Sequence, residues 1–184
     1  MKESTRRLRV KRIAQSGIFT ATTISLGYLL FFIPNIELMS ASIFSSGWLF
    51  GPTVGFIVGG TSFAIFSFFN PLGASLPPLF IAQVIGGILL GVAGGFCRIS
   101  VSGLPLFLRI PILGIAGGLL TLFYDVITNI GGFIAFTTEK TFLAYLISGI
   151  VFSLVHIISN VLIFSMLLAP ILGRIEILRK GMTL

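Results

Sequence analysis

Six apolar runs, separated by short breaks, constrain the fold of this chain more than any other feature. A helix needs about 20 predominantly apolar residues to cross a bilayer, and most of these runs reach or approach that length. Proline, glycine and asparagine mark nearly every break, as expected where helices end. The runs cover approximately residues 13–33, 38–50, 53–69, 78–96, 106–133 and 142–168. The pattern predicts an all-α membrane protein, a bundle of six transmembrane helices with a short second helix.

The composition excludes a soluble domain. Hydrophobic residues make up 55% of the 184, charged residues only 9%, and the mean hydropathy is +1.11. A soluble protein of this size cannot bury so much apolar surface, because most of its own surface must face water. The single cysteine, Cys97, allows neither an internal disulfide nor a cysteine-based metal site.

The basic residues are placed as in a membrane protein with many spans. Eleven of the twelve lie in residues 1–12, between Arg98 and Arg109, or after residue 170, and the remaining one is Lys140. Cytoplasmic segments carry such an excess, so the net charge of +7 indicates orientation rather than nucleic-acid binding. Five spans would put the basic clusters on opposite sides, whereas six put both termini in the cytoplasm. We therefore expect a basic cytoplasmic arm (1–12), one membrane domain (13–170) and a basic cytoplasmic tail (171–184).

Small residues recur every four positions in three of the predicted helices. Such stripes allow helix backbones to approach closely within a membrane. In the third and fourth helices the stripes, which we expect to pack inside the bundle, are Gly51, Gly55 and Gly59, and Gly87, Gly91 and Gly95. In the first helix the stripe of Gly17, Ala21 and Ser25 could pack internally or meet another subunit.

Polar residues inside the apolar runs indicate a binding cavity. Asp125 and Asn129 share one helix face, and a carboxylate in hydrocarbon costs about 3 kcal/mol or more unless it faces a cavity or a partner. Other polar residues that we predict at a similar depth, in the outer half of the membrane, are further candidates. Polar residues in the breaks between helices on the outer side are also included. The full candidate set is Asn35, Glu37, Asn70, Gln83, Tyr124, Asp125, Thr128, Asn129, His156 and Asn160.

Each candidate also has a purely structural interpretation. Asp125 could pair with Asn129 or with backbone groups, and His156 could be a satisfied interior histidine. Gln83 and Asn160 could cross-link helices by hydrogen bonds, and Glu37 could simply be solvated. The sequence leaves the rotation of each helix about its axis open.

Several catalytic motifs are absent from the sequence. It contains no P-loop, H-E-x-x-H or G-x-S-x-G pattern, so we expect neither an enzyme nor a bound metal or cofactor. One isolated intramembrane acid makes no obvious proton relay, and no inverted repeat of a secondary transporter is visible. A binding subunit that takes its energy from partner proteins fits better.

The order of motifs along the whole chain resembles one membrane-protein family. A small-residue first helix is followed by Pro34-Asn35-Ile36-Glu37-Leu38 and a short second helix. Gly51-Pro52 then leads the third helix, Asn70-Pro71-x-Gly73 follows it, and a glycine-rich fourth helix precedes Tyr124-Asp125-x-x-Thr128-Asn129. This order is similar to that of the S component, the substrate-specific membrane subunit of energy-coupling factor (ECF) vitamin transporters.

The resemblance implies a function and a set of partners. Such a subunit captures a vitamin or related micronutrient outside a prokaryotic cell, with the outer loops and outer helix halves forming the pocket, and reorients in the cytoplasmic membrane to deliver it. Its first helix contacts a coupling transmembrane subunit through an Ala-x-x-x-Ala type motif, and two cytoplasmic ATPases supply the energy. The positions here that match the docking motif are Ala14, Gly17, Ala21 and Ser25.

The chemistry of the candidates favours a neutral or cationic ligand. They include acids but no basic residue, so nothing at that depth would compensate a buried anion. Two other functions remain open from the sequence. One is an ion-coupled carrier that acts alone, and the other is a non-catalytic membrane scaffold of an envelope complex.

Overall fold

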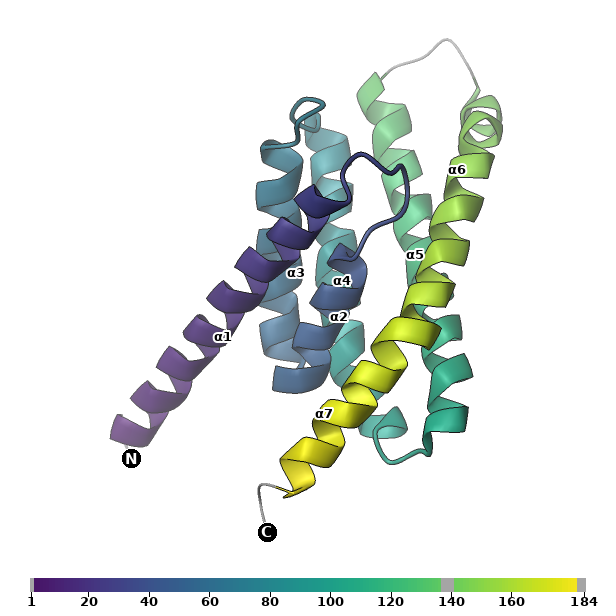
Figure 1. Ribbon diagram of the computed structural model, residues 1–184. Coiled ribbons are helices and arrows are strands. Elements are labelled where there is room, and N and C mark those ends of the chain that lie inside the picture. The colour runs from purple at the N-terminus through teal and green to yellow at the C-terminus, as the bar shows by residue number, and fades with distance from the viewer. Residues whose placement is uncertain (1, 137–140, 182–184) are drawn as a thin grey trace.

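The computed structural model, which describes residues 2–136 and 141–181, is built from helices alone over those residues (Figure 1). Every predicted run corresponds to a helix. The elements are α1 (Lys2–Leu29), α2 (Met39–Phe50), α3 (Pro52–Phe68), α4 (Pro77–Val101), α5 (Leu106–Phe136), α6 (Phe142–Leu162), the π-helix η1 (Ile163–Leu168) and α7 (Ala169–Gly181).

Three continuous helical stretches are long and apolar enough to cross a membrane. They are Pro77–Val101, Leu106–Phe136 and Phe142–Arg179, and Pro52–Phe68 is a shorter apolar helix. The prediction of an all-helical membrane protein is confirmed at this level. The short second helix is also present, with 12 residues.

The helix bounds differ from the prediction at both ends of the chain. Helix α1 includes the basic arm from Lys2 onward and ends at Leu29, four residues before the predicted end. Arginine and lysine are good helix formers, and no glycine or proline interrupts residues 2–16. At the other end, η1 widens the turn immediately before Pro170, so the proline ring is accommodated and the helix continues into the predicted tail. Met1, residues 137–140 with Lys140, and residues 182–184 lie outside the described residues.

Helix α4 is the centre of the bundle, in contact with α2, α3 and α5. A seam of glycines brings its backbone against α3. A Cβ atom added to Gly55 would meet the carbonyl oxygen of Gly91, and one added to Gly59 would meet that of Gly87. The expected internal packing of the two stripes is confirmed for these residues. Gly51 is different, because its φ of 97° makes the turn between α2 and α3 and its missing side chain faces open space.

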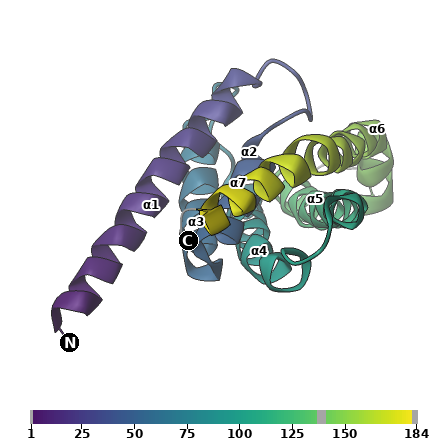
Figure 2. The ribbon, with the colours of Figure 1, turned by 60° about the horizontal axis from the view of Figure 1, so that its bottom comes forward.

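The small-residue stripe of α1 faces away from the bundle. Its members Ala14, Gly17, Ala21 and Ser25 are all exposed, and a Cβ atom on Gly17 would meet nothing within 4 Å. The opposite face of α1 makes the internal contacts, with Thr23 Oγ1 lying 2.7 Å from Ser42 Oγ and Thr20 Oγ1 lying 2.9 Å from Thr61 Oγ1. Figure 2 shows α1 running along one flank of the bundle with its N-terminal part projecting from it. Internal packing therefore does not account for the stripe.

These two environments predict opposite responses to the same substitution. Gly55→Ala should lower the free energy of unfolding by about 2 kcal/mol, because the new methyl group meets a backbone carbonyl that cannot move independently. Gly17→Ala should be neutral or slightly stabilising, since alanine is the better helix former and the site is open. Thermal unfolding of the two variants in the same detergent measures the difference. Equal stabilities would show that the seam is not tightly packed.

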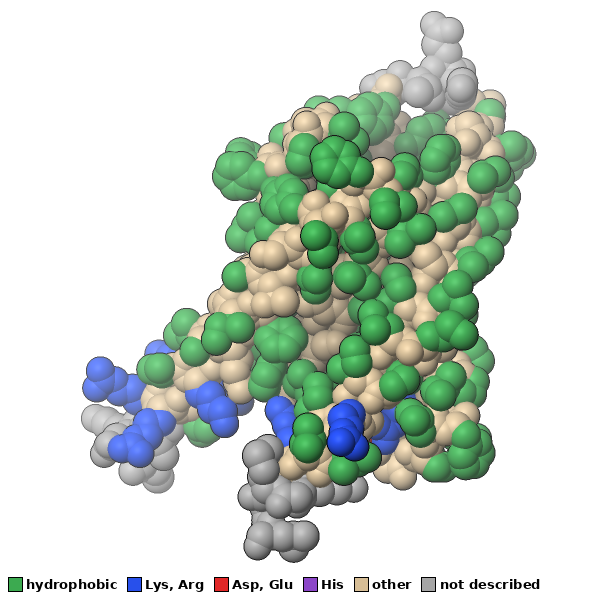
Figure 3. Space-filling view, viewed as in Figure 1, with side chains coloured by type: hydrophobic (Ala, Val, Ile, Leu, Met, Phe, Trp, Pro, Cys, Tyr) green, Lys and Arg blue, Asp and Glu red, His purple; other side chains and the backbone are tan. Residues whose placement is uncertain are grey.

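A buried polar network closes the end of the bundle that carries both termini. The Arg109 guanidinium lies 2.9 Å from the Glu176 carboxylate, and Trp48 Nε1 donates to the same carboxylate at 2.9 Å. Arg109 also donates to the carbonyl oxygens of Ser102 and Leu104. The network joins α2, α5 and α7. Figure 3 shows lysine and arginine side chains gathered at this end, with hydrophobic side chains covering much of the rest of the face.

Candidate functional site

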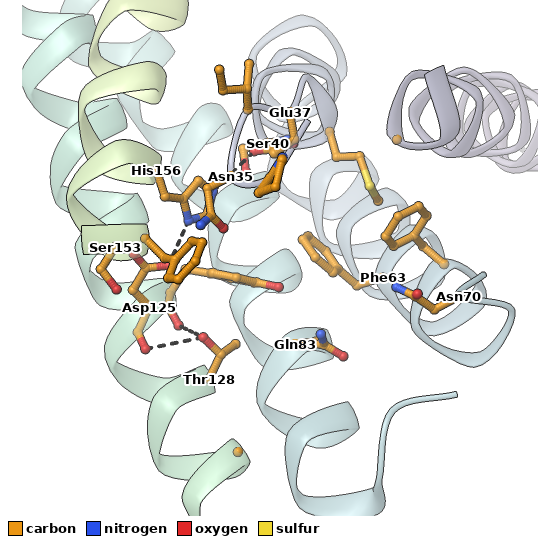
Figure 4. A pocket seen from close by; sticks show the side chains of 18 of the residues that line it. Asn35, Glu37, Ser40, Phe63, Asn70, Gln83, Asp125, Thr128, Ser153 and His156 are labelled. Atoms are coloured by element: carbon orange, nitrogen blue, oxygen red, sulfur yellow. Dashed lines mark hydrogen bonds and ion pairs between the residues drawn. The ribbon is translucent and has the colours of Figure 1, made fainter. Parts of the chain in front are cut away.

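A cavity of about 480 Å³ opens at the end of the bundle remote from the basic residues of the described chain. The loop between α1 and α2 covers one side of it, and α3, α4, α5 and α6 supply the other walls (Figure 4). Nine of the ten candidate residues line it, namely Asn35, Glu37, Asn70, Gln83, Tyr124, Asp125, Thr128, Asn129 and His156. The tenth, Asn160, is fully buried one helical turn from His156 and does not line the cavity.

The centre of the site is an imidazole held between two carboxylates. His156 Nδ1 lies 2.7 Å from Asp125 Oδ1, and His156 Nε2 lies 3.7 Å from Glu37 Oε1. Figure 4 shows His156 between these two acids, which come from α5 and from the loop before α2. Asn160 on α6 also contacts Glu37, since its Nδ2 donates a hydrogen bond to Glu37 Oε1 at 3.4 Å. Asp125 is therefore one of two acids that contact the same histidine.

Glu37 is held by the start of α2 and by two side chains of α6. Its Oε2 accepts a hydrogen bond of 2.8 Å from the Ser40 backbone N–H, which lies in the first turn of α2 and has no partner within the helix. Burial would raise the pKa of Glu37, but the interactions with His156 and Ser40 outweigh it and hold the pKa below its ordinary value. The carboxylate is therefore ionised at neutral pH.

Two of the candidates on α5 donate hydrogen bonds to backbone carbonyl oxygens of their own helix. Thr128 Oγ1 donates to the Tyr124 carbonyl oxygen at 2.8 Å, and Asn129 Nδ2 donates to the Asp125 carbonyl oxygen at 2.7 Å. Asn129 thus bonds the backbone of Asp125 and not its carboxylate. Asp125 therefore pairs with Asn129 through its backbone carbonyl, while its carboxylate contacts His156.

Three buried acceptor oxygens at the site have no hydrogen-bond partner within the described part of the chain. They are Asp125 Oδ2, Gln83 Oε1 and Asn160 Oδ1. A buried polar atom without a partner is uncommon in folded proteins and calls for an explanation, such as a bound ligand or water. Asp125 is the most enclosed of the acids at the site, with 8% of its surface exposed.

Aromatic side chains form much of the cavity wall, and sequence reasoning missed most of them. The ring of Phe63 on α3 lies 5.2 Å from that of Tyr124, and the Tyr124 ring meets His156 edge-on at 6.0 Å. The other aromatic residues that line the cavity are Phe31, Phe66, Tyr145 and Phe152. With 19 phenylalanines in the chain, no local pattern distinguishes those of the cavity from those that face lipid.

No lysine or arginine of the described chain lines this cavity. Within the same residues, no group of three or more histidine, cysteine, aspartate or glutamate side chains is arranged to hold a metal ion. The site can therefore offer a ligand negative charge, hydrogen-bond acceptors and aromatic surface.

No family model, curated protein or solved structure matches the chain.

Proposed function

We propose that this chain is the substrate-binding subunit of an ECF-type importer in the cytoplasmic membrane of a prokaryote. It captures a vitamin-like small molecule from outside for uptake driven by partner subunits. The observation that carries the proposal is the cavity, which gathers nine dispersed polar residues at the end opposite the lysines and arginines that the structure describes.

The distribution of lysine and arginine residues indicates the orientation of the bundle in the membrane. By the positive-inside rule, the end that carries the lysines and arginines faces the cytoplasm, and the cavity then opens to the outside. Helix α2 is too short to cross a bilayer alone, but eight of its residues are buried, so protein rather than lipid surrounds most of it. Six helices with both termini in the cytoplasm are consistent with these features.

The exposed stripe on α1 supports docking to a coupling subunit. Ala14, Gly17, Ala21 and Ser25 present a smooth face that no other part of the described chain covers, and small residues permit close approach of a second helix in lipid. The partners would be a coupling transmembrane subunit and two cytoplasmic ATPases, and the energy for uptake would come from those ATPases.

Uptake with the partner subunits tests the proposal. Ala21→Leu should reduce ATP-dependent uptake, and co-purification with the coupling subunit, by about tenfold, the factor that corresponds to about 1.4 kcal/mol of lost association energy. Thr22→Leu is the control, because Thr22 is equally exposed but lies about 100° around the helix from Ala21. Native mass spectrometry of the purified subunit identifies the small molecule that it retains. If neither substitution affects uptake, α1 is not the docking helix.

The acid–imidazole–acid group also favours a second candidate, an ion-coupled carrier that acts alone. Titratable side chains in contact within a membrane protein are the usual parts of a proton relay. Liposomes that contain only this chain distinguish the two functions. Uptake driven by a proton gradient without any ATPase would establish the carrier and exclude the need for partners.

A further inference from the structure

We propose that the ligand of the cavity is a planar organic cation that donates N–H hydrogen bonds to the unpartnered oxygens of Asp125 and Gln83, is attracted by the charges of Asp125 and Glu37, and lies against the aromatic wall. This inference rests on the proposed function and narrows its substrate class from neutral or cationic molecules to cations of one shape. Charge, unpartnered acceptors and ring surface each support it.

The balance of charge at the site is negative. Two carboxylates flank a single imidazole, so the group keeps a net negative charge even when His156 carries a proton. The other titratable side chains that line the cavity are the phenols of Tyr124 and Tyr145, which add no positive charge. An uncompensated charge is costly when it is enclosed, and a cationic ligand would remove that cost.

The unpartnered atoms are acceptors and therefore select a ligand with donors. Asp125 is more than nine-tenths buried, and its Oδ2 has no partner in the described chain. Gln83 on α4 is only partly buried, but its Oε1 is buried and also has no partner there. Figure 4 shows Gln83 on α4, apart from Asp125 and His156. A ligand with N–H groups on more than one edge could satisfy both walls. A quaternary ammonium could supply the charge but not the hydrogen bonds.

The wall favours a flat aromatic or amidine-like cation over an inorganic ion. Phe63, Tyr124 and the other rings of the cavity provide aromatic surface, and the π faces of such rings attract cations and stack with planar groups. The cavity of about 480 Å³ falls within the size range of sites for small organic molecules.

Four probes of similar size separate charge from hydrogen bonding. They are benzamidinium (cation with N–H donors), phenyltrimethylammonium (cation without them), benzamide (neutral) and benzoate (anion). Calorimetric titration of the purified wild-type protein should give benzamidinium an affinity at least about tenfold above benzamide, since charge-assisted hydrogen bonds are roughly twice as strong as neutral ones. Phenyltrimethylammonium should be intermediate, and benzoate should not bind.

Glu37→Gln tests the assignment at a residue outside the spanning helices. It keeps the shape of the side chain and should bring the affinity for benzamidinium close to that for benzamide, with the affinity for benzamide changed less than twofold. If that variant does not fold, the four-probe series on the wild-type protein still tests the proposal. Equal or tighter binding of benzoate, equal binding of charged and neutral probes, or no binding of any probe would overturn it. An anion-selective cavity would leave the uptake experiment, and so the proposed function, intact.

Discussion

The Asp125→Asn protein is expected to bind benzamidinium about 30-fold more weakly than the wild type, since losing one partner of a buried charge pair costs about 2 kcal/mol or more. The substitution preserves the size of the side chain but removes its charge. It also replaces an unpartnered acceptor oxygen with either an oxygen of lower charge or an N–H donor. Binding of benzamide should change little, because a neutral ligand has no charge for Asp125 to stabilise. Titration calorimetry on both proteins measures the two ratios.

A control on the same helix separates binding from packing. Thr121 lies one turn before Asp125, is 2% exposed, and donates only to the Gly117 carbonyl oxygen of its own helix. It does not line the cavity, so Thr121→Val should leave both affinities unchanged. If Asp125→Asn lowered the unfolding temperature without changing any affinity or uptake, Asp125 would be a structural residue. That result would favour the scaffold alternative.

The Glu176→Ala protein is expected to lose about 3 kcal/mol or more of stability, because removing one partner of a buried ion pair leaves the other charge uncompensated. The Arg109 side chain is 6% exposed and that of Glu176 is 15% exposed, so the guanidinium is largely shielded from water. The Trp48 N–H would also lose its acceptor. Trp48 is the only tryptophan of the chain and is fully buried, so its emission follows unfolding in detergent.

Arg174→Gln is the matched control for this network. Arg174 lies on the same helix, is exposed, and its replacement should change the free energy of unfolding by no more than about 0.5 kcal/mol. The double variant Arg109→Met with Glu176→Leu should recover much of the lost stability, because it leaves no unpaired charge. Equal stabilities of Glu176→Ala and Arg174→Gln would mean that the ion pair does not hold α7 to the bundle.

Local residue chemistry was sufficient to predict most helix starts. Pro52 and Pro77 each occupy the first position of a helix, where the missing N–H costs nothing, and Gly51 makes the turn that separates α2 from α3. The prediction was weaker where two tendencies compete. Residues 30–33 are apolar enough to continue α1 but form turns instead, as the chain reverses towards α2. The sixth predicted helix continues into α7 through the π-helix before Pro170, and no local sequence pattern predicts that π-helix.

The contents of the cavity were largely predictable, but their pairing was not. Polar residues in an apolar helix stand out from their neighbours, which is why Asp125, His156 and Gln83 were found. Phe63 was not found, because a phenylalanine of the cavity is chemically the same as one that faces lipid. The contact of His156 with Glu37 joins residues that are far apart in sequence and lie on different elements.

By itself, the sequence determined that the six apolar runs form helices, where most of these helices begin and at which end most of the basic residues gather. These properties follow from the kind of residue at each position along a helix axis. Only the tertiary structure decided how each helix is rotated about that axis. It turned the glycines of α3 and α4 towards each other, left the small stripe of α1 uncovered, and placed His156 between two acids. The physical reason is that in an apolar helix every face is compatible with lipid, so side-chain packing and hydrogen bonding between helices select the face that turns inward.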